Sequence, residues 1–184
     1  MSNLELSSKK LHFIQTATRL FATYGFHTAG VDLIAKEAQI PKATLYNYFR
    51  SKERFIDICL VVQKERLQDQ VIEMFEYDHA TSALDKLKKL YYLHSDIEGP
   101  YYLLFKAIFE TKNHYPNAYL TAIRYRTWLT NEIYSQLRLV KNDVSFTDAK
   151  LFLYMIEGGI IQLLGSDVAI EREKMLDYFL VSLY

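Results

Sequence analysis

Apolar residues recur every three or four positions along almost the whole 184-residue chain. The segment 31–38 shows the pattern in its simplest form, because Val31, Ile34, Ala35 and Ala38 stand at positions i, i+3, i+4 and i+7. This spacing places the four side chains on one face of an α-helix, whereas a strand requires alternation, which no segment shows. The sequence therefore predicts an all-α fold.

Glycine, proline and capping residues divide the chain into about nine helices. Gly25 ends the first helix, Pro41 opens the third, Ser51 caps the fourth, and Pro100 and Pro116 open the sixth and seventh. The expected ranges are 8–24, 31–38, 41–49, 51–75, 80–94, 100–112, 116–140, 146–165 and 168–183. The eighth of these helices is apolar almost all round, which predicts burial on every side.

Composition places the chain among folded proteins without disulfides. Charged residues make up 24% of the sequence, and the 6 glycines and 3 prolines exclude collagen-like and low-complexity classes. Cys59 is the single cysteine, so no internal disulfide can form, and we expect a buried, inert thiol. No apolar run approaches the roughly 18 residues of a membrane span, and no secretory signal is recognisable. These features predict a cytoplasmic protein with no membrane partner.

Sequence signals for catalysis and for bound metals are missing. The five histidines never stand at i, i+4 with one another or with a cysteine, so no metal-site spacing is present. No nucleophile–base pair and no glycine-rich phosphate loop is recognisable. We therefore expect no enzymatic activity, no metal and no cofactor.

The three short helices in the first 50 residues have the spacing of a helix-turn-helix unit. In the third of them, Leu45 and Phe49 lie four residues apart and anchor one face inward. The outward face then presents Lys42, Tyr46 and Asn47, whose side chains can bond phosphate oxygens or base edges. Further candidates on this helix are Ala43 on the same face, and Thr44 and Tyr48 along one edge.

Positive charge is concentrated at this end of the chain. The whole sequence has 22 basic and 22 acidic residues, and so a net charge of zero. Residues 1–54 contain 8 basic and 4 acidic residues, a net charge of +4, which leaves −4 for residues 55–184. A basic segment can release counterions from the DNA backbone whatever the total charge of the chain. The neutral total therefore does not exclude a nucleic-acid partner.

Three stretches within residues 10–55 resemble the tetracycline-repressor-like (TetR) family of bacterial transcription regulators. They are Leu20-Phe-Ala-Thr-Tyr-Gly25, Ile34-Ala35-Lys-Glu-Ala38 and Thr44-Leu-Tyr-Asn-Tyr-Phe-Arg-Ser-Lys-Glu53. The resemblance implies a DNA-binding domain over residues 1–50 and a ligand-binding and dimerisation domain over residues 51–184, linked by the helix 51–75. It also implies a homodimer formed through residues 146–183, and a ligand that releases a palindromic DNA operator.

The resemblance assigns roles to individual positions of the helix-turn-helix unit. Tyr46 matches the family's phosphate-binding tyrosine, and Lys52 matches a lysine that touches the DNA backbone from the start of the fourth helix. Lys42, Thr44 and Tyr48 match positions that commonly meet bases or phosphates. These five residues form the core of the expected DNA-binding set.

Three residues depart from the family pattern. Gly30 replaces a threonine that caps the second helix and bonds a phosphate, which moves that contact to a backbone N–H or to Thr28. Gln39 replaces the usual turn glycine, and Pro41 replaces the usual capping serine. The operator sequence cannot be inferred from these residues.

Two interpretations of the aromatic residues in the C-terminal part stay open, namely core packing and the walls of a small-ligand pocket. The polar candidates for such a pocket are His94, Arg124 and Glu157, which lie on otherwise apolar segments. The aromatic candidates are Tyr102, Phe105, Phe109, Tyr125 and Trp128. A pocket of this composition predicts a small apolar or aromatic ligand.

The sequence thus predicts a dimeric DNA-binding transcription regulator, a repressor that a small ligand releases from its operator. Two rival hypotheses are a helical small-molecule-binding protein or enzyme with an incidental basic head, and a protein-interaction adaptor. The adaptor would be a monomer with an exposed apolar face at residues 151–183, whereas the regulator buries that face in a dimer. The oligomeric state therefore separates these hypotheses.

Overall fold

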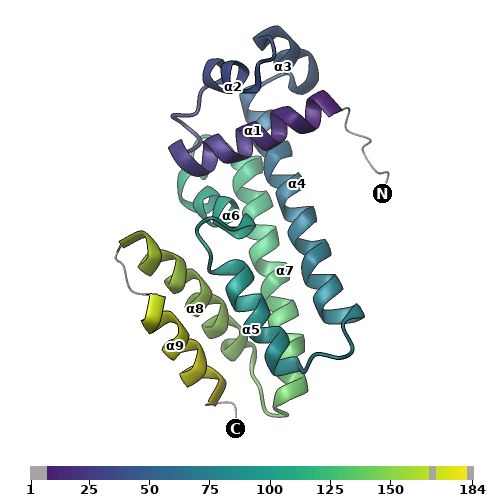
Figure 1. Cartoon of the computed structure of the whole chain (residues 1–184), viewed down its shortest axis with the longest axis vertical. Helices are drawn as coiled ribbons and strands as arrows, with labels where there is room; N and C mark the ends of the chain where they lie inside the picture. The colour runs from purple at the N-terminus through teal and green to yellow at the C-terminus, as the bar shows by residue number, and fades with distance from the viewer. Residues whose placement is uncertain (1–7, 166–168, 182–184) are drawn as a thin grey trace.

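The computed structural model describes residues 8–165 and 169–181, and every regular element in these ranges is a helix (Figure 1). A head of three short helices stands at one end of the molecule: α1 (Ser8–Tyr24), α2 (Val31–Ala38) and α3 (Lys42–Phe49). The prediction of an all-α fold with an N-terminal helix-turn-helix unit is confirmed.

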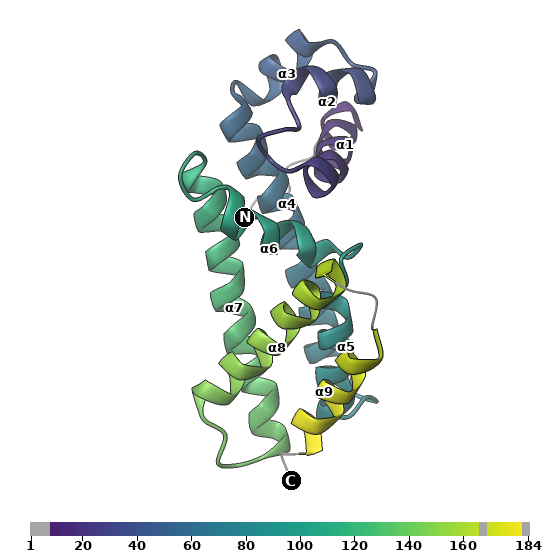
Figure 2. The same ribbon diagram turned by 90° about the vertical axis from the view of Figure 1, so that its left-hand side faces the viewer.

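The body is built around two long helices, α4 and α7, which run side by side away from the head (Figure 1). Its helices are α4 (Lys52–Ile72), α5 (Ala83–His94), α6 (Pro100–Glu110), α7 (Pro116–Val140), α8 (Phe146–Gly165) and α9 (Ala169–Val181). A short π-helical turn, Glu73–Tyr77, follows α4 directly. α5 and α6 pack against α7, and α8 and α9 lie together on one side of the body (Figure 2).

Most helix ends follow the capping residues of the sequence. Gly25 stops α1 in the left-handed conformation with φ of 85°, which glycine adopts without strain. The Ser51 hydroxyl accepts a hydrogen bond from the Arg54 N–H at 3.1 Å and so caps α4. Pro100 and Pro116 occupy the first turns of α6 and α7. The ranges expected for α1, α2, α7 and α8 agree with the structure.

Several helix ends differ from the prediction by one to three residues, and α4 begins at Lys52 rather than at its cap Ser51. α3 begins one residue later than expected, with Pro41 as its N-cap. Regular α4 ends at Ile72, because the chain continues through Phe75 as the π-helical turn. α5 begins after Ser82, whose hydroxyl caps it, and α6 ends at Glu110. The ends expected for the last helix at residues 168 and 183 lie outside the described residues.

The head encloses a small aromatic core that continues into α4. Phe13 of α1 lies with its ring centroid 6.3 Å from that of Phe49 of α3 and 6.4 Å from that of Phe55 of α4. Phe49 and Phe55 are closer still, at 4.4 Å, and all three rings are buried. Edge-on and tilted ring contacts of this kind add to the free energy of burial. α4 therefore belongs to the core of the head as well as to the body.

α6 joins the body to the head at the C-terminal end of α1. Lys106 Nζ donates to the Ala22 carbonyl at 2.8 Å, and Glu110 Oε2 accepts the Phe26 N–H at 2.8 Å. The ammonium group compensates the carbonyls that a helix leaves unpaired at its C-terminus. A Cβ atom on Gly25 would lie 2.7 Å from Glu110 Oε2, so a side chain there would displace this carboxylate, in addition to the strain of the positive φ.

The expectation that α8 is buried on every side was wrong. Its inner side chains are buried, but four apolar side chains on its outer side are between 50% and 59% exposed, and α9 carries three more that are at least half exposed. We call these seven residues the outer apolar face: Leu151, Tyr154, Ile161 and Leu164 of α8, and Met175, Tyr178 and Val181 of α9. A single chain therefore covers only the inner side of α8. Exposed apolar patches of this kind often mark interaction sites.

Candidate nucleic-acid interface

α3 presents a polar face to solvent because its apolar residues anchor the other side. Leu45 and Phe49 are buried in the head, as the sequence predicted. The exposed side chains of α3 are Lys42, Ala43, Tyr46 and Asn47. A cation, a phenol and an amide therefore lie within two helical turns, with one small residue among them. These are the groups that bond phosphates and base edges.

An ion pair links α3 to α2 at the start of α3. Lys42 Nζ lies 2.7 Å from Asp32 Oδ1, and both side chains are largely exposed. The hydrogen bond to Asp32 is the main cause that raises the pKa of Lys42 above its ordinary value. Because water screens an exposed pair, a phosphate can compete with Asp32 for this ammonium group.

Tyr48 lies differently from the neighbouring Tyr46. Tyr46 is exposed, whereas Tyr48, which the sequence placed along one edge of the helix, is half-buried. The Tyr48 ring meets Phe13 edge-on at 6.5 Å, and Lys10 Nζ lies 5.2 Å from the Tyr48 centroid. Thr44, on the same edge of α3, is also half-buried. The edge formed by Thr44 and Tyr48 therefore packs partly against α1.

Lys52 connects the head to a loop of the body. Its Nζ donates to the His27 carbonyl at 3.2 Å and lies 6.0 Å from the centroid of the Tyr115 ring. The His27 ring stacks on Tyr115 at 5.4 Å and contacts His114 at 4.8 Å. Partial burial lowers the pKa of Lys52. The roles of His27 and Tyr115 around this lysine were not predicted, because they are distant from it in sequence.

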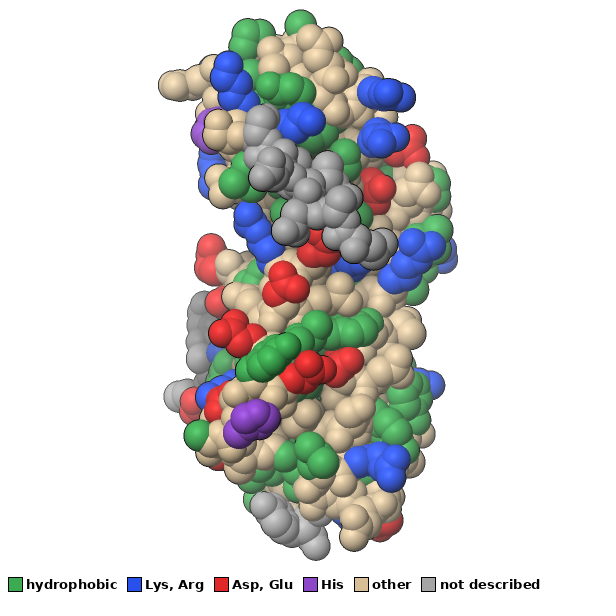
Figure 3. All heavy atoms as spheres, turned by 90° about the vertical axis from the view of Figure 1, so that its right-hand side faces the viewer, with side chains coloured by type: hydrophobic (Ala, Val, Ile, Leu, Met, Phe, Trp, Pro, Cys, Tyr) green, Lys and Arg blue, Asp and Glu red, His purple; other side chains and the backbone are tan. Residues whose placement is uncertain are grey.

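Charge is distributed as the sequence indicated. On the face in Figure 3, Lys and Arg side chains lie over the head at the top, and acidic side chains gather over the middle of the body. The cut after Arg54 separates a segment of net charge +4 from one of −4. The basic segment contains the whole of α3.

Two of the sequence-predicted ligand residues form a buried pair in the body. His94 Nε2 lies 2.6 Å from the Tyr125 hydroxyl, and His94 Nδ1 lies 2.9 Å from the Leu90 carbonyl. Since a carbonyl only accepts, Nδ1 carries the proton and Nε2 accepts from the Tyr125 hydroxyl. Burial lowers the pKa of His94 to about 4 and raises that of Tyr125. Trp128, another candidate, is half-buried with its ring 5.5 Å from that of Tyr125.

A second, half-buried group surrounds Glu157. Arg126 donates two hydrogen bonds to its carboxylate, at 2.6 and 2.9 Å, and the Tyr101 hydroxyl donates a third at 3.1 Å. Arg124, the arginine selected from the sequence, is exposed and is not part of this group. The partners of Glu157 were missed because they depend on how α7 faces α8.

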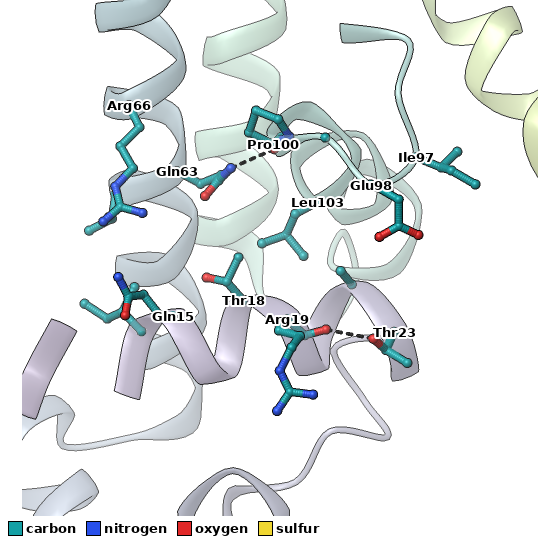
Figure 4. Close-up of a pocket in the computed structure, with 14 residues that line it drawn as sticks. Gln15, Thr18, Arg19, Thr23, Gln63, Arg66, Ile97, Glu98, Pro100 and Leu103 are labelled. Atoms are coloured by element: carbon teal, nitrogen blue, oxygen red, sulfur yellow. Dashed lines mark hydrogen bonds between the residues drawn. The ribbon is translucent and has the colours of Figure 1, made fainter. Parts of the chain in front are cut away.

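The remaining ligand candidates lie on α6. Phe105 is buried, Tyr102 is half-buried, and Phe109 is 69% exposed. The pocket at the junction of α1, α4 and α6, shown in Figure 4, is lined by none of the eight residues selected from the sequence. The structure therefore brings together His94, Tyr125 and Trp128, and it separates them from Phe109 and Arg124.

Reactive cysteines, three-residue metal sites and membrane-spanning helices are all absent from the described residues. Cys59 is fully buried, and burial raises the pKa of its thiol, as expected for an inert side chain. Among the described residues, no three His, Cys, Asp or Glu side chains are placed to hold a metal ion. No described helix is both long enough and apolar enough to cross a membrane.

Comparison with known proteins places the head in a family. The model for "Bacterial regulatory proteins, tetR family" matches residues 13–57, which contain most of α1, all of α2 and α3, and the start of α4. Residues 13–57 are therefore similar to the DNA-binding segment of TetR-family regulators.

Individual curated relatives match different shares of the chain. The fatty acid metabolism regulator protein of Bacillus subtilis is 36% identical over 80 residues, which are 44% of this chain and 39% of that protein. The regulator UidR of Escherichia coli is 30% identical over 81 residues, 43% of this chain and 41% of that protein. The matches thus span about two fifths of the length of these curated relatives.

Solved structures share the fold over nearly the whole length of this chain. A TetR transcriptional regulator from Legionella pneumophila has a TM-score of 0.80 and 17% identity, covering 99% of this chain and 97% of that one. At this identity the likeness concerns the fold alone. The fold of that structure therefore extends through the body of this chain, beyond the residues that the family model matches.

The departures from the TetR-family pattern have visible consequences in the head. Gly30 is the N-cap of α2 and provides no side-chain cap, while Thr28 is exposed and its carbonyl accepts the Gly30 N–H at 2.8 Å. Gln39 adopts φ of 55°, the left-handed region that glycine tolerates best. The turn between α2 and α3 thus places a non-glycine residue in the left-handed region, which strains the backbone at Gln39.

Proposed function

We propose that this chain is a homodimeric, DNA-binding transcription regulator of the TetR family, whose two α3 helices enter successive major grooves of a palindromic operator. The observation that supports it most directly is the exposed polar face of α3 above the buried anchors Leu45 and Phe49. The proposed DNA-contacting residues are Thr28, Lys42, Ala43, Thr44, Tyr46, Asn47, Tyr48 and Lys52. Tyr46 and Lys52 would bond the backbone and fix the register, while Asn47 and its neighbours meet base edges.

The charge distribution supports the same proposal. The net charge of +4 over residues 1–54 favours phosphate contacts, while the −4 of the remainder opposes non-specific binding through the body. Each lysine or arginine that neutralises a phosphate releases counterions, so operator affinity should fall as salt rises. A flat salt response would contradict this role of the head.

The outer apolar face supports a dimer. Its seven side chains belong to α8 and α9, the helices through which residues 146–183 were expected to pair. A two-fold axis through this face would bury it against its own copy and align the two heads on one side. Light scattering on the full chain should give the mass of a dimer. A monomer would favour the rival adaptor hypothesis, in which this face receives another protein.

Ligand release and repression belong to the proposal as well. A ligand that binds the non-DNA conformation better lowers operator affinity by its differential binding energy, typically about 1 to 3 kcal/mol. The relative from Bacillus subtilis is named as a fatty acid metabolism regulator, but its match of 80 residues covers 44% of this chain and does not transfer a ligand class to the body. A reporter gene placed behind the operator would distinguish repression from activation.

The test begins with an operator selected from a random duplex library by the full chain. Binding is then measured at two salt concentrations for the wild type, Tyr46→Ala and Lys52→Ala. Tyr77→Ala and Lys88→Ala are matched controls, because these residues lie on the body away from α3. We expect both head variants to bind more weakly, and Lys52→Ala to reduce the salt slope by about one. Unaltered affinity in both head variants would overturn the assignment.

A further inference from the structure

A groove of about 420 Å³ opens where the head meets the body. α1 forms one wall, α4 the second, and the loop before α6 with the first turn of α6 forms the third (Figure 4). Its volume lies in the range of roughly 300–1,000 Å³ that is typical of small-molecule sites. The groove is separate from the His94 and Glu157 groups, and both head and body line it.

The middle of the groove is mostly apolar, with one amide and the Thr18 hydroxyl. Ile14 of α1 and Leu103 of α6 are buried side chains that line it. Gln63 of α4 is also buried, and its Nε2 donates to the Pro100 carbonyl at 3.0 Å. This bond fixes the amide, and Figure 4 shows its oxygen directed toward α1. A ligand here would meet apolar walls, the fixed Gln63 oxygen and the Thr18 hydroxyl.

The two ends of the groove carry opposite charges. Arg66 of α4 lies at one end beside Gln15, and Glu98 of the loop before α6 lies at the other, near Thr23 (Figure 4). Gln15 and Thr23 are eight residues apart on α1, which corresponds to about 12 Å along the helix. Within residues 8–165 and 169–181, neither Arg66 nor Glu98 has an ion-pair partner.

A second arginine on the rim is already engaged. Arg19 points away from the centre of the groove in Figure 4, and its guanidinium pairs with Glu37 of α2 at 3.4 Å. Among the described residues on the rim, Arg66 is therefore the arginine that a ligand can meet without displacing a carboxylate. A fatty acid bound at Arg66 would place its apolar tail against Glu98 and desolvate that carboxylate without a partner. The charge pattern instead suits a molecule with a charge of each sign at its two ends.

We propose that this groove binds an elongated small zwitterion, with its anionic group at Arg66, its apolar middle on Leu103, and its cationic group at Glu98. As an effector site, the groove deepens the proposed regulatory function and rests on it. α1 belongs to the head and α6 to the body, so a ligand that spans both binds one head orientation better than another. It then shifts operator affinity by that difference.

The test uses 8-aminooctanoate as the zwitterion, with octanoate and octylamine as probes that keep one charge each. Calorimetry on the full chain compares the wild type with Arg66→Gln, Glu98→Gln and the distant control Lys88→Gln. We expect each groove variant to weaken aminooctanoate binding by about 3- to 5-fold, because exposed ion pairs contribute up to about 1 kcal/mol. Arg66→Gln should leave octylamine binding unchanged, and Glu98→Gln should leave octanoate binding unchanged.

Two outcomes would overturn the proposal. One is that aminooctanoate does not bind the folded wild type, and the other is that both groove variants bind it as the wild type does. Circular dichroism checks that each variant is folded. Operator binding without any probe keeps the two proposals apart. If the chain binds the operator but no probe, only the proposal for the groove is overturned. If the probes bind in a charge-dependent way but the chain binds no operator, the groove proposal is supported and the regulatory function is overturned.

Discussion

The head and the body distribute polar and apolar side chains in opposite ways. The head buries phenylalanines such as Phe13, Phe49 and Phe55 and turns the polar side of α3 to solvent. The body encloses hydrogen-bonded polar groups, buried at His94 and half-buried at Glu157, and it exposes the outer apolar face. Pairing of this kind offsets the cost of removing polar groups from water.

The difference indicates what each region is suited to meet. A polar, basic surface with a rigid apolar support suits a charged, hydrated partner such as DNA. An apolar surface above a hydrogen-bonded interior suits a partner that can exclude water, such as a second copy of the chain. Four substitutions test this contrast, from the largest expected effect to the smallest.

Phe49→Ala should destabilise the head more than any change on its surface. The ring is buried and contacts both Phe13 and Phe55, so its removal leaves a cavity and costs about 3–5 kcal/mol of unfolding free energy. Tyr46→Ala, three residues earlier on the exposed side, should change stability by at most about 0.5 kcal/mol. Urea denaturation at one protein concentration measures both. Equal losses would show that α3 is not anchored as described.

Acidification should destabilise the body through His94. Burial lowers its folded-state pKa to about 4, against an ordinary value of 6.5. The unfolded chain therefore binds more protons between these pH values, so stability is complete above pH 6.5 and falls by up to about 3 kcal/mol as the pH drops toward 4. Urea midpoints from pH 7.5 to 4.5 should fall less in His94→Gln than in the exposed-residue control His79→Gln. Parallel curves would contradict the assignment.

Ile161→Asp should separate the proposed dimer while leaving each chain folded. Ile161 is 59% exposed on one chain, so a carboxylate there is tolerated in a monomer. Buried across a dimer without a partner, it would cost about 1–3 kcal/mol in each protomer. Light scattering over a dilution series gives the association constant. Tyr77→Asp, at an exposed site beyond α4, is the control and should remain dimeric. An unchanged mass for Ile161→Asp would place the interface elsewhere.

Gln39→Gly should stabilise the head slightly. The residue has φ of 55°, where a side chain is strained, and glycine relieves that strain at an entropic cost in the unfolded chain. A net gain of about 0.5–1 kcal/mol is expected, visible as a higher melting temperature. Lys36→Gly, inside α2, should lower it instead by a similar amount. A lower melting temperature for Gln39→Gly would show that the glutamine side chain contributes to the turn.

Local patterns predicted the head well. The spacing of Leu45 and Phe49 fixed the orientation of α3, and Ser51 was recognisable as a cap, because both signals act within one helical turn. The half-burial of Tyr48 was not predicted, since it depends on the packing of α1 across α3. Burial of a residue at a helix edge is decided by the neighbouring helix.

The contacts of the body were much less predictable. The helices were assigned correctly, but the choice of Arg126 over Arg124 as the partner of Glu157 depends on how α7 is rotated against α8. The groove is assembled from three segments that no single periodicity connects. The outer side of α8 was predicted to be buried because it is apolar, but it is exposed in one chain. Apolar character alone does not say whether a helix packs against its own chain or against another.

The contact between Gly25 and Glu110 limits how this protein could be rebuilt. A chimera that joins a foreign head to this body keeps this head–body contact only if the donor head has a glycine in place of Gly25. It must also have a backbone N–H in place of that of Phe26, to bond Glu110. A donor with a side chain at the position of Gly25 would displace the Glu110 carboxylate from its hydrogen bond to the head. Compatibility between interchangeable heads and bodies can therefore be screened at two positions before any gene is synthesised.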